Sequence, residues 1–183
     1  MSRVSRSSTL VLLAMVGAAA LGPPAASASD ANLRTLVAKQ AASDKKADKV
    51  KITEPNSRSP QAFNRFYRRY ANLAEKSEKT VDRFRTAFAH EVAETAEAER
   101  GRILVLRGLR DESNALGDIG HAFRRAASRM LKYRYSQRGL RSAQRRLARE
   151  VTKASKIGTR GDERVKSGAK AIKAAPAPTS PAA

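Results

Sequence analysis

The sequence predicts an all-α fold, a long antiparallel helical hairpin with coiled-coil-like packing. Two observations predict it. From Phe66 to Leu109, large apolar residues stay on one side of a helix with 3.6 residues per turn, and from Leu116 onward apolar residues recur at heptad spacing. Between these stretches the phase of the pattern shifts across polar residues, which indicates that the chain turns there.

The first residues have the pattern of a secretory signal peptide. Arg3 and Arg6 precede a short apolar run at residues 10–21, and small residues at 26–28 suit a signal peptidase. The run is shorter than the roughly 20 residues that span a bilayer. We therefore expect residues 1–28 to be removed, and the mature protein to be secreted or associated with the cell envelope, without stable membrane insertion.

Residues 29–60 are predicted to form a short helix followed by a polar linker. Leu33 and Leu36 share one face of this helix, whereas residues 41–60 are polar and charged. Pro60 suits the first turn of the next helix, because an N–H at that position would have no partner within the helix.

The hairpin is predicted over residues 61–165, with helices at about 61–110 and 114–157. A short polar turn at 108–114 would make them antiparallel neighbours. The side chains expected in the seam between the helices are Phe66, Tyr70, Phe84, Phe88, Leu116, Phe123, Met130, Leu140 and Leu147. Residues 166–183 are rich in Ala and Pro and are predicted to be a disordered tail.

Two helices of this length leave apolar surface uncovered. The heptad pattern also puts Gln137 and Gln144 into the seam, where buried amides weaken packing. Three alternatives would complete the core: the short helix that precedes the linker, a fold-back of one long helix, or a second molecule of the protein.

Positive charge is concentrated in the second half of the chain. The formal net charge is +20, and residues 113–175 have seventeen Lys or Arg against four Asp or Glu. Such an excess favours attraction to anionic polymers or anionic membranes and has no bearing on the fold.

A turn near residue 112 would place a group of acids opposite a group of bases. The acids are Glu91, Glu94, Glu97 and Glu99, and the bases are Arg124, Arg125, Arg129 and Lys132. Cations farther from the turn would then lack acidic partners. The candidate polyanion-binding residues are Arg134, Arg138, Arg141, Arg145, Arg146 and Arg149, together with Arg65, Arg68, Arg69 and Tyr135.

Catalytic and metal-binding patterns are weak. The chain has no Cys, which excludes thiolate chemistry, and no Gly-rich loop follows a predicted strand. His90 lies far from the apolar stripe and His121 falls at an outer heptad position, so both are expected to face solvent. The sequence predicts no enzyme, no cofactor and no metal site.

These observations favour a secreted, non-enzymatic basic protein that binds an anionic polymer through its Arg-rich helix. Extracellular nucleic acid and a phosphate-rich cell-wall polymer both fit this charge pattern. The alternative is a structural or interaction protein that self-associates, or recruits an envelope partner, through its apolar helical stripe.

Overall fold

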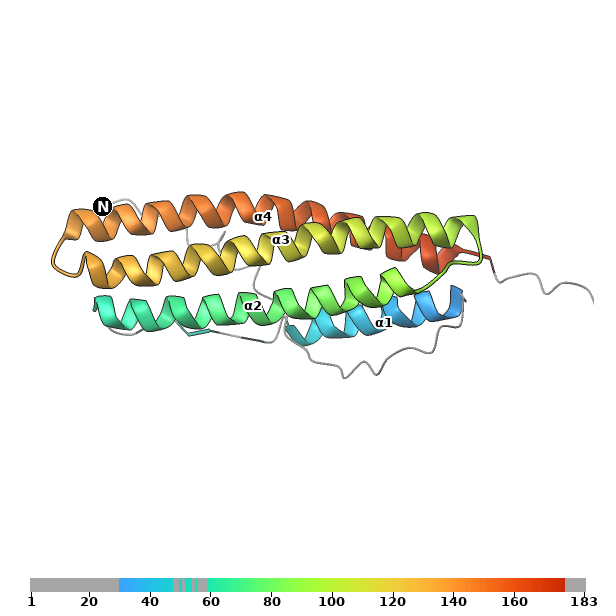
Figure 1. Cartoon of the computed structure of the whole chain (residues 1–183), viewed down its shortest axis with the longest axis horizontal. Helices are drawn as coiled ribbons and strands as arrows, with labels where there is room; N and C mark the ends of the chain where they lie inside the picture. Colours follow the sequence, from blue (N-terminus) through green and yellow to red (C-terminus); the bar gives the residue numbers. More distant parts are fainter. Residues whose placement is uncertain (1–29, 48–49, 51, 54, 56–58, 177–183) are drawn as a thin grey trace, which may run out of the picture.

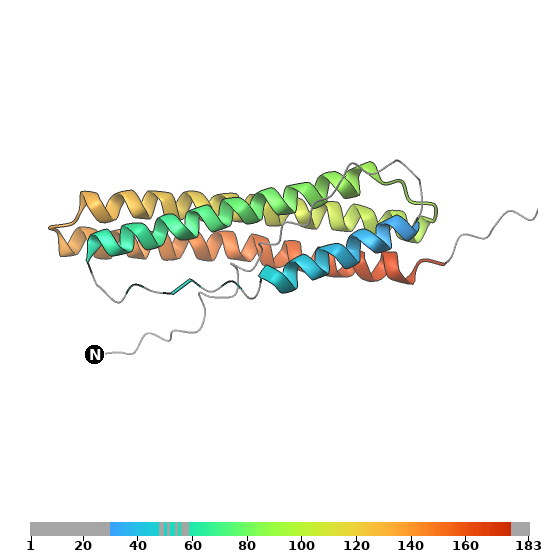
Figure 2. The same ribbon diagram turned by 90° about the horizontal axis from the view of Figure 1, so that it is seen from below.

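The computed structural model describes residues 30–47, 50, 52, 53, 55 and 59–176, and every regular element in these ranges is an α-helix. The helices are α1 (Asp30–Ala47), α2 (Pro60–His90), α3 (Ala96–Lys132) and α4 (Gln137–Ala174). The three long helices run antiparallel in sequence order, and α3 packs against both α2 and α4 (Figure 1). The short α1 covers one half of this bundle (Figure 2). The prediction of an all-α fold is confirmed.

The turn predicted at 108–114 is wrong, because α3 runs through it without a break. The chain instead turns at residues 91–95 and 133–136. Ser113 was expected in the turn but is buried, and its hydroxyl donates to Asp82 Oδ1 of α2 at 2.9 Å. Ser113 therefore links α3 to α2 and does not mark a turn.

The single helix predicted over residues 61–110 is two helices, α2 and α3. Asp30 of α1 stabilises the turn between them, since its carboxylate accepts from the Glu94 backbone N–H at 2.8 Å and from Thr95 Oγ1 at 2.7 Å. Thr95 then caps α3 by accepting from the Ala98 N–H. Because the chain turns, Val92 of the predicted stripe is 63% exposed.

The helix predicted over residues 114–157 also has an internal turn. Ser136 caps α4 by accepting from the Gly139 N–H at 3.1 Å, and α4 continues to Ala174. Residues 166–174, predicted to be part of a disordered tail, are therefore helical. Gln137 and Gln144, which were predicted to lie in the seam, are instead exposed. The predicted signal peptide and residues 177–183 lie outside the described residues.

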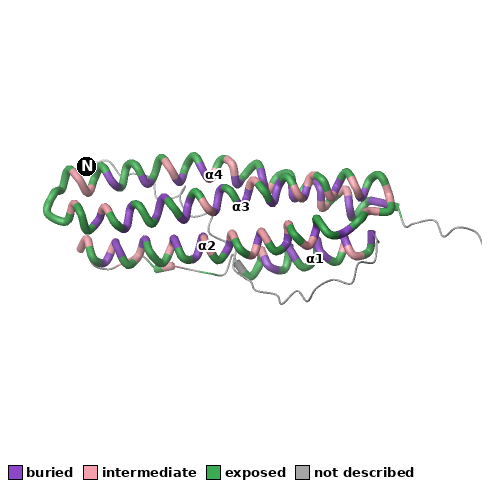
Figure 3. The backbone as a smooth tube through the Cα atoms, in the orientation of Figure 1, coloured by how far each residue is buried: buried purple, intermediate pink, exposed green. Residues whose placement is uncertain are grey.

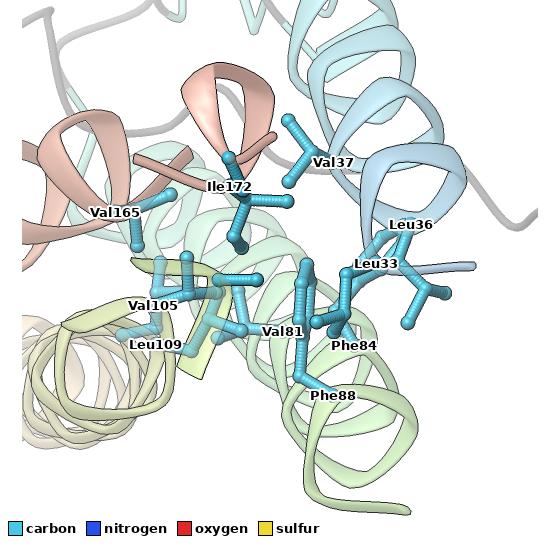
Figure 4. Packing of buried hydrophobic residues seen from close by; sticks show 13 residues of the cluster. Leu33, Leu36, Val37, Val81, Phe84, Phe88, Val105, Leu109, Val165 and Ile172 are labelled. Carbon is cyan, nitrogen blue, oxygen red and sulfur yellow. The ribbon is translucent and has the colours of Figure 1, made fainter. Parts of the chain in front are cut away.

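The core has two parts along the bundle. Where α1 is present, Leu33, Leu36 and Val37 pack with Phe84, Phe88 and other residues of the three long helices (Figure 4). In the other half, α2, α3 and α4 form the core without α1. Of the predicted seam residues, those buried are Phe84, Phe88, Leu116, Phe123, Met130 and Leu147, and those half-buried are Phe66, Tyr70 and Leu140.

Glycines let α3 and α4 approach closely. A Cβ on Gly101 would lie 2.7 Å from the Gly168 carbonyl oxygen, and a Cβ on Gly161 would lie 2.8 Å from that of Gly108. The buried positions of α4 then repeat at heptad spacing as far as Ile172. This packing fixes which side of α4 faces the bundle and which side faces outward.

Candidate anion-binding face of helix α4

One face of α4 is lined by seven cations, which we call the α4 cation row. They are Arg138, Arg141, Arg145, Arg149, Lys153, Lys156 and Arg160. Steps of three or four residues place them on one side of the helix, opposite the residues buried against α3. All seven side chains are exposed, and the outward side of α4 is largely exposed in Figure 3.

The α4 cation row is not neutralised by the acids that the structure describes. None of its seven side chains forms an ion pair with another described residue. The acid of α4 nearest to the middle of the row, Glu150, accepts from Arg125 at 2.9 Å and from Arg146 at 2.8 Å. Hydrogen bonds from these two guanidinium groups hold the pKa of Glu150 below its usual value. Glu150 is therefore engaged by cations outside the row.

The local sequence sets where the row begins. Gly139 lies against the ring of Tyr133, and a Cβ at Gly139 would lie 2.7 Å from Tyr133 Cγ. The ring therefore folds over the first turn of α4, and Lys132 Nζ lies 5.6 Å from its centroid. The tight turn sends α4 back along α3, so the cations that follow point away from the bundle.

The other predicted binding residues are only partly brought together. Arg134 and Tyr135 lie in the turn before the row, with the Arg134 guanidinium 4.8 Å from the ring centroid of Tyr135, which is 90% exposed. Arg146 is an exposed residue of α4, but it pairs with Glu150.

The basic residues of α2 lie at the same end of the molecule as this turn. Arg65, Arg68 and Arg69 are exposed on the first turns of α2. In Figure 1, α2 and α4 flank α3 on opposite sides. These three arginines therefore do not extend the α4 cation row.

Sequence analysis missed Lys153, Lys156 and Arg160. Their signal is present, since the spacing of three and four residues continues beyond Arg149. The predicted basic row ended at Arg149, although the predicted helix continued to about residue 157. The correct turn leaves the basic row intact as far as Arg160.

The predicted pairing of the Glu91–Glu99 acids with the Arg124–Lys132 bases is wrong. Because the chain turns at residues 91–95, these groups lie near opposite ends of the bundle. Arg124 instead pairs with Glu75 of α2, and Arg125 with Glu150 of α4. Glu91 accepts from Asn32 Nδ2 of α1 at 3.2 Å.

A second polar feature lies under α1. Glu112 of α3 is only 5% exposed, and its Oε2 has no hydrogen-bond partner. Burial, with smaller contributions from Asp44 and Asp162, raises the pKa of Glu112 to about 8. The side chain lines a groove of about 460 Å³ between α1 and α4, which Lys166 also lines. At neutral pH this carboxyl is therefore mostly protonated.

Metal-binding geometry is lacking in the described part of the chain, where no three His, Cys, Asp or Glu side chains are placed to hold a metal ion. His90 and His121 are both exposed. Among the described helices, none combines the length and apolar character needed to cross a membrane. Comparisons with protein-family models, curated proteins and solved structures found no match.

Proposed function

We propose that this protein is a non-enzymatic binding protein that holds an anionic polymer along the α4 cation row. The observation that supports the proposal is the row itself, seven exposed cations on one helix face without an ion-pair partner among the described residues. A polyanion that contacts these side chains releases its condensed counterions, which drives binding.

The packing of α4 favours this role. Ala143, Leu147, Val151 and Ala154 of α4 are buried in the core along the length of the row. The backbone that supports the row is thus fixed before binding, so the protein itself loses mainly side-chain freedom when the polymer binds. A rigid row costs less entropy to engage than the same cations on a disordered segment.

The signal-peptide pattern at residues 1–28 favours a polymer outside the cell. Extracellular nucleic acid and phosphate-rich wall polymers share closely spaced phosphates, and the row matches that chemistry. The proposal therefore names a secreted or envelope-associated protein whose ligand is recognised by charge.

The proposal is tested by removing equal charge from two faces. One variant replaces Arg138, Arg145 and Arg149 of α4 with Gln. The matched control replaces three exposed cations of α3, also without ion-pair partners among the described residues, with Gln: Arg100, Arg107 and Arg110. Binding to a fluorescent single-stranded oligonucleotide is measured over a range of salt concentrations, with circular dichroism to verify folding.

We expect the α4 variant to lose roughly two units of slope in a plot of log Kobs against log salt, about 0.7 per lost contact. The α3 control should keep the wild-type slope, because its cations point elsewhere. Equal losses in both variants would reject the α4 cation row as the binding surface and leave only a general charge effect.

A second candidate function is self-association, which a specific observation favours. Phe63, Phe66 and Tyr70 of α2 are only half-buried in the half of the bundle that lacks α1. The rest of the predicted stripe is used inside the molecule, since Phe84 and Phe88 pack with α1. A molecular mass that stays monomeric at all accessible concentrations in light scattering would exclude this candidate.

A further inference from the structure

The α4 cation row has a shape that discriminates between polyanions. Its first and last members, Arg138 and Arg160, are separated by about 33 Å along the helix at 1.5 Å per residue. Between them the cations follow one another every 4.5–6 Å or so along a nearly straight line. A ligand that engages the whole row must therefore present phosphates along a line of the same length.

A single flexible chain can meet this requirement. It can lie along α4 and adjust its backbone so that successive phosphates reach successive cations. Ser142, Ala148 and Thr152, which lie between the cations, are exposed and uncharged, so no acid interrupts the path.

A double helix meets the requirement poorly. Its phosphates wind around the duplex axis, so a straight row of cations meets each strand only where that strand crosses the row. A lone α-helix overcomes this by entering the major groove, which is about 12 Å wide. α4 is nearly straight along the row, whereas the groove winds around the duplex axis, so only part of the row can lie in one groove at a time.

The row also lacks an aromatic platform on which bases could stack. From Arg138 to Arg160, α4 contains no aromatic residue on which a base could stack. The exposed Tyr135 lies before the first cation, and Arg134 already lies over its ring. The phosphates are therefore the groups that the row is placed to engage, without aromatic stacking on bases.

We propose that the α4 cation row binds one flexible phosphate chain along its whole length, in preference to a duplex and without stacking on bases. This inference rests on the proposed function and specifies the ligand class of the same surface.

The test compares four probes with equal numbers of phosphates: linear inorganic polyphosphate, a single-stranded oligonucleotide, an abasic strand and a duplex hairpin. Affinity of the whole protein for each probe is measured against salt concentration. We expect the three single-chain probes to bind within about threefold of one another, with slopes near −5 for seven contacts. The duplex should bind at least tenfold more weakly near 150 mM salt and show a shallower slope.

Two variants test whether the whole row is used. One replaces Arg138 and Arg141 with Gln, and the other replaces Lys156 and Arg160. For a chain that follows the row, both should reduce the polyphosphate slope by the same amount, roughly 1.4 units. A loss confined to the first variant would show that only the turn end binds and would overturn the inference.

The outcomes separate this inference from the proposed function. Duplex binding equal to or tighter than that of the single chains, or an abasic strand tenfold weaker than the normal strand, overturns the inference and leaves polyanion binding intact. Failure of all four probes to bind overturns both.

Discussion

Gly108 of α3 lies so close to Gly161 of α4 that a Cβ on Gly108 would be 2.6 Å from the Gly161 carbonyl oxygen. Gly161 in turn leaves room for the stem of Glu112, whose Cγ would lie 2.9 Å from a Cβ at Gly161. The same contact thus brings the two backbones together. It also leaves space for the buried carboxyl of Glu112, whose Oε2 has no hydrogen-bond partner among the described residues. It also orients α4 so that its cations face outward.

Replacing Gly108 with Ala should destabilise the protein. The added methyl group would meet backbone atoms, which cannot move aside, so we expect a loss of about 1–3 kcal/mol despite the better helix propensity of Ala. Gly120→Ala is the matched control in the same helix, because its Cβ would meet its nearest atoms at 3.6 Å. The control should be neutral or more stable by up to about 1 kcal/mol. Urea unfolding that ranks the two variants the other way would contradict the close contact.

Glu112 should make stability fall as pH rises. The folded protein holds a proton on this carboxyl up to about pH 8, whereas the unfolded chain releases it near the ordinary pKa of 4.5. The stabilising effect of the bound proton is therefore complete below pH 4.5 and lost by about pH 8, at roughly 1.4 kcal/mol per pH unit between these values.

The Glu112→Gln variant should lack this dependence and be more stable than the wild type at pH 8. The free energy of urea unfolding, measured across this pH window, provides the check. Glu97→Gln removes an exposed carboxyl of the same helix and should keep the wild-type slope. Parallel curves for the wild type and Glu112→Gln would disprove the buried, protonated state.

Asp30→Ala should loosen the turn between α2 and α3. The substitution leaves the Glu94 N–H and the Thr95 hydroxyl without their acceptor, which we expect to cost about 1–3 kcal/mol. Hydrogen exchange of the amides at residues 94–98 should increase in the same variant. The exposed Asp118 serves as control, and an Asp118→Ala variant that loses as much stability would argue against a specific role for Asp30.

Glu150→Gln should strengthen polyanion binding. The substitution removes the acid next to the α4 cation row and frees Arg125 and Arg146 from their ion pairs. We expect a gain in affinity of a few-fold at low salt that fades as salt screens the charges. Glu97→Gln, in the first turn of α3 and far from Glu150, changes the net charge equally and should have little effect on binding. Weaker binding by Glu150→Gln would show that its two ion pairs position the cations instead.

Helix content was predictable from the sequence, but the positions of the turns were not. Val92 and Ile103 happen to continue the phase of the α2 stripe, although both are exposed. The buried face of α3 begins instead with Ala98 and Gly101, small residues that a search for large apolar side chains passes over. The heptad positions of α3 and α4 remain in phase across the turn at residues 133–136. The apolar periodicity therefore did not reveal this turn.

The candidate site was predictable to a similar degree. A row of cations at helical spacing can be seen in the sequence, as the prediction of Arg138 to Arg149 shows. Which cations lack partners depends on the helix that lies opposite, and this required the correct turns. The inclusion of Arg146 has another cause, since its partner Glu150 lies four residues along the same helix and this pair could have been found in the sequence.

The salt dependence of binding to linear polyphosphate tests the central claim most directly. It compares the wild type with a variant in which all seven cations of the α4 cation row are replaced by Gln. We predict a slope near −5 for the wild type and a loss of most of that slope in the variant, whose helical content should be unchanged. A variant that keeps the wild-type affinity and slope would contradict the account.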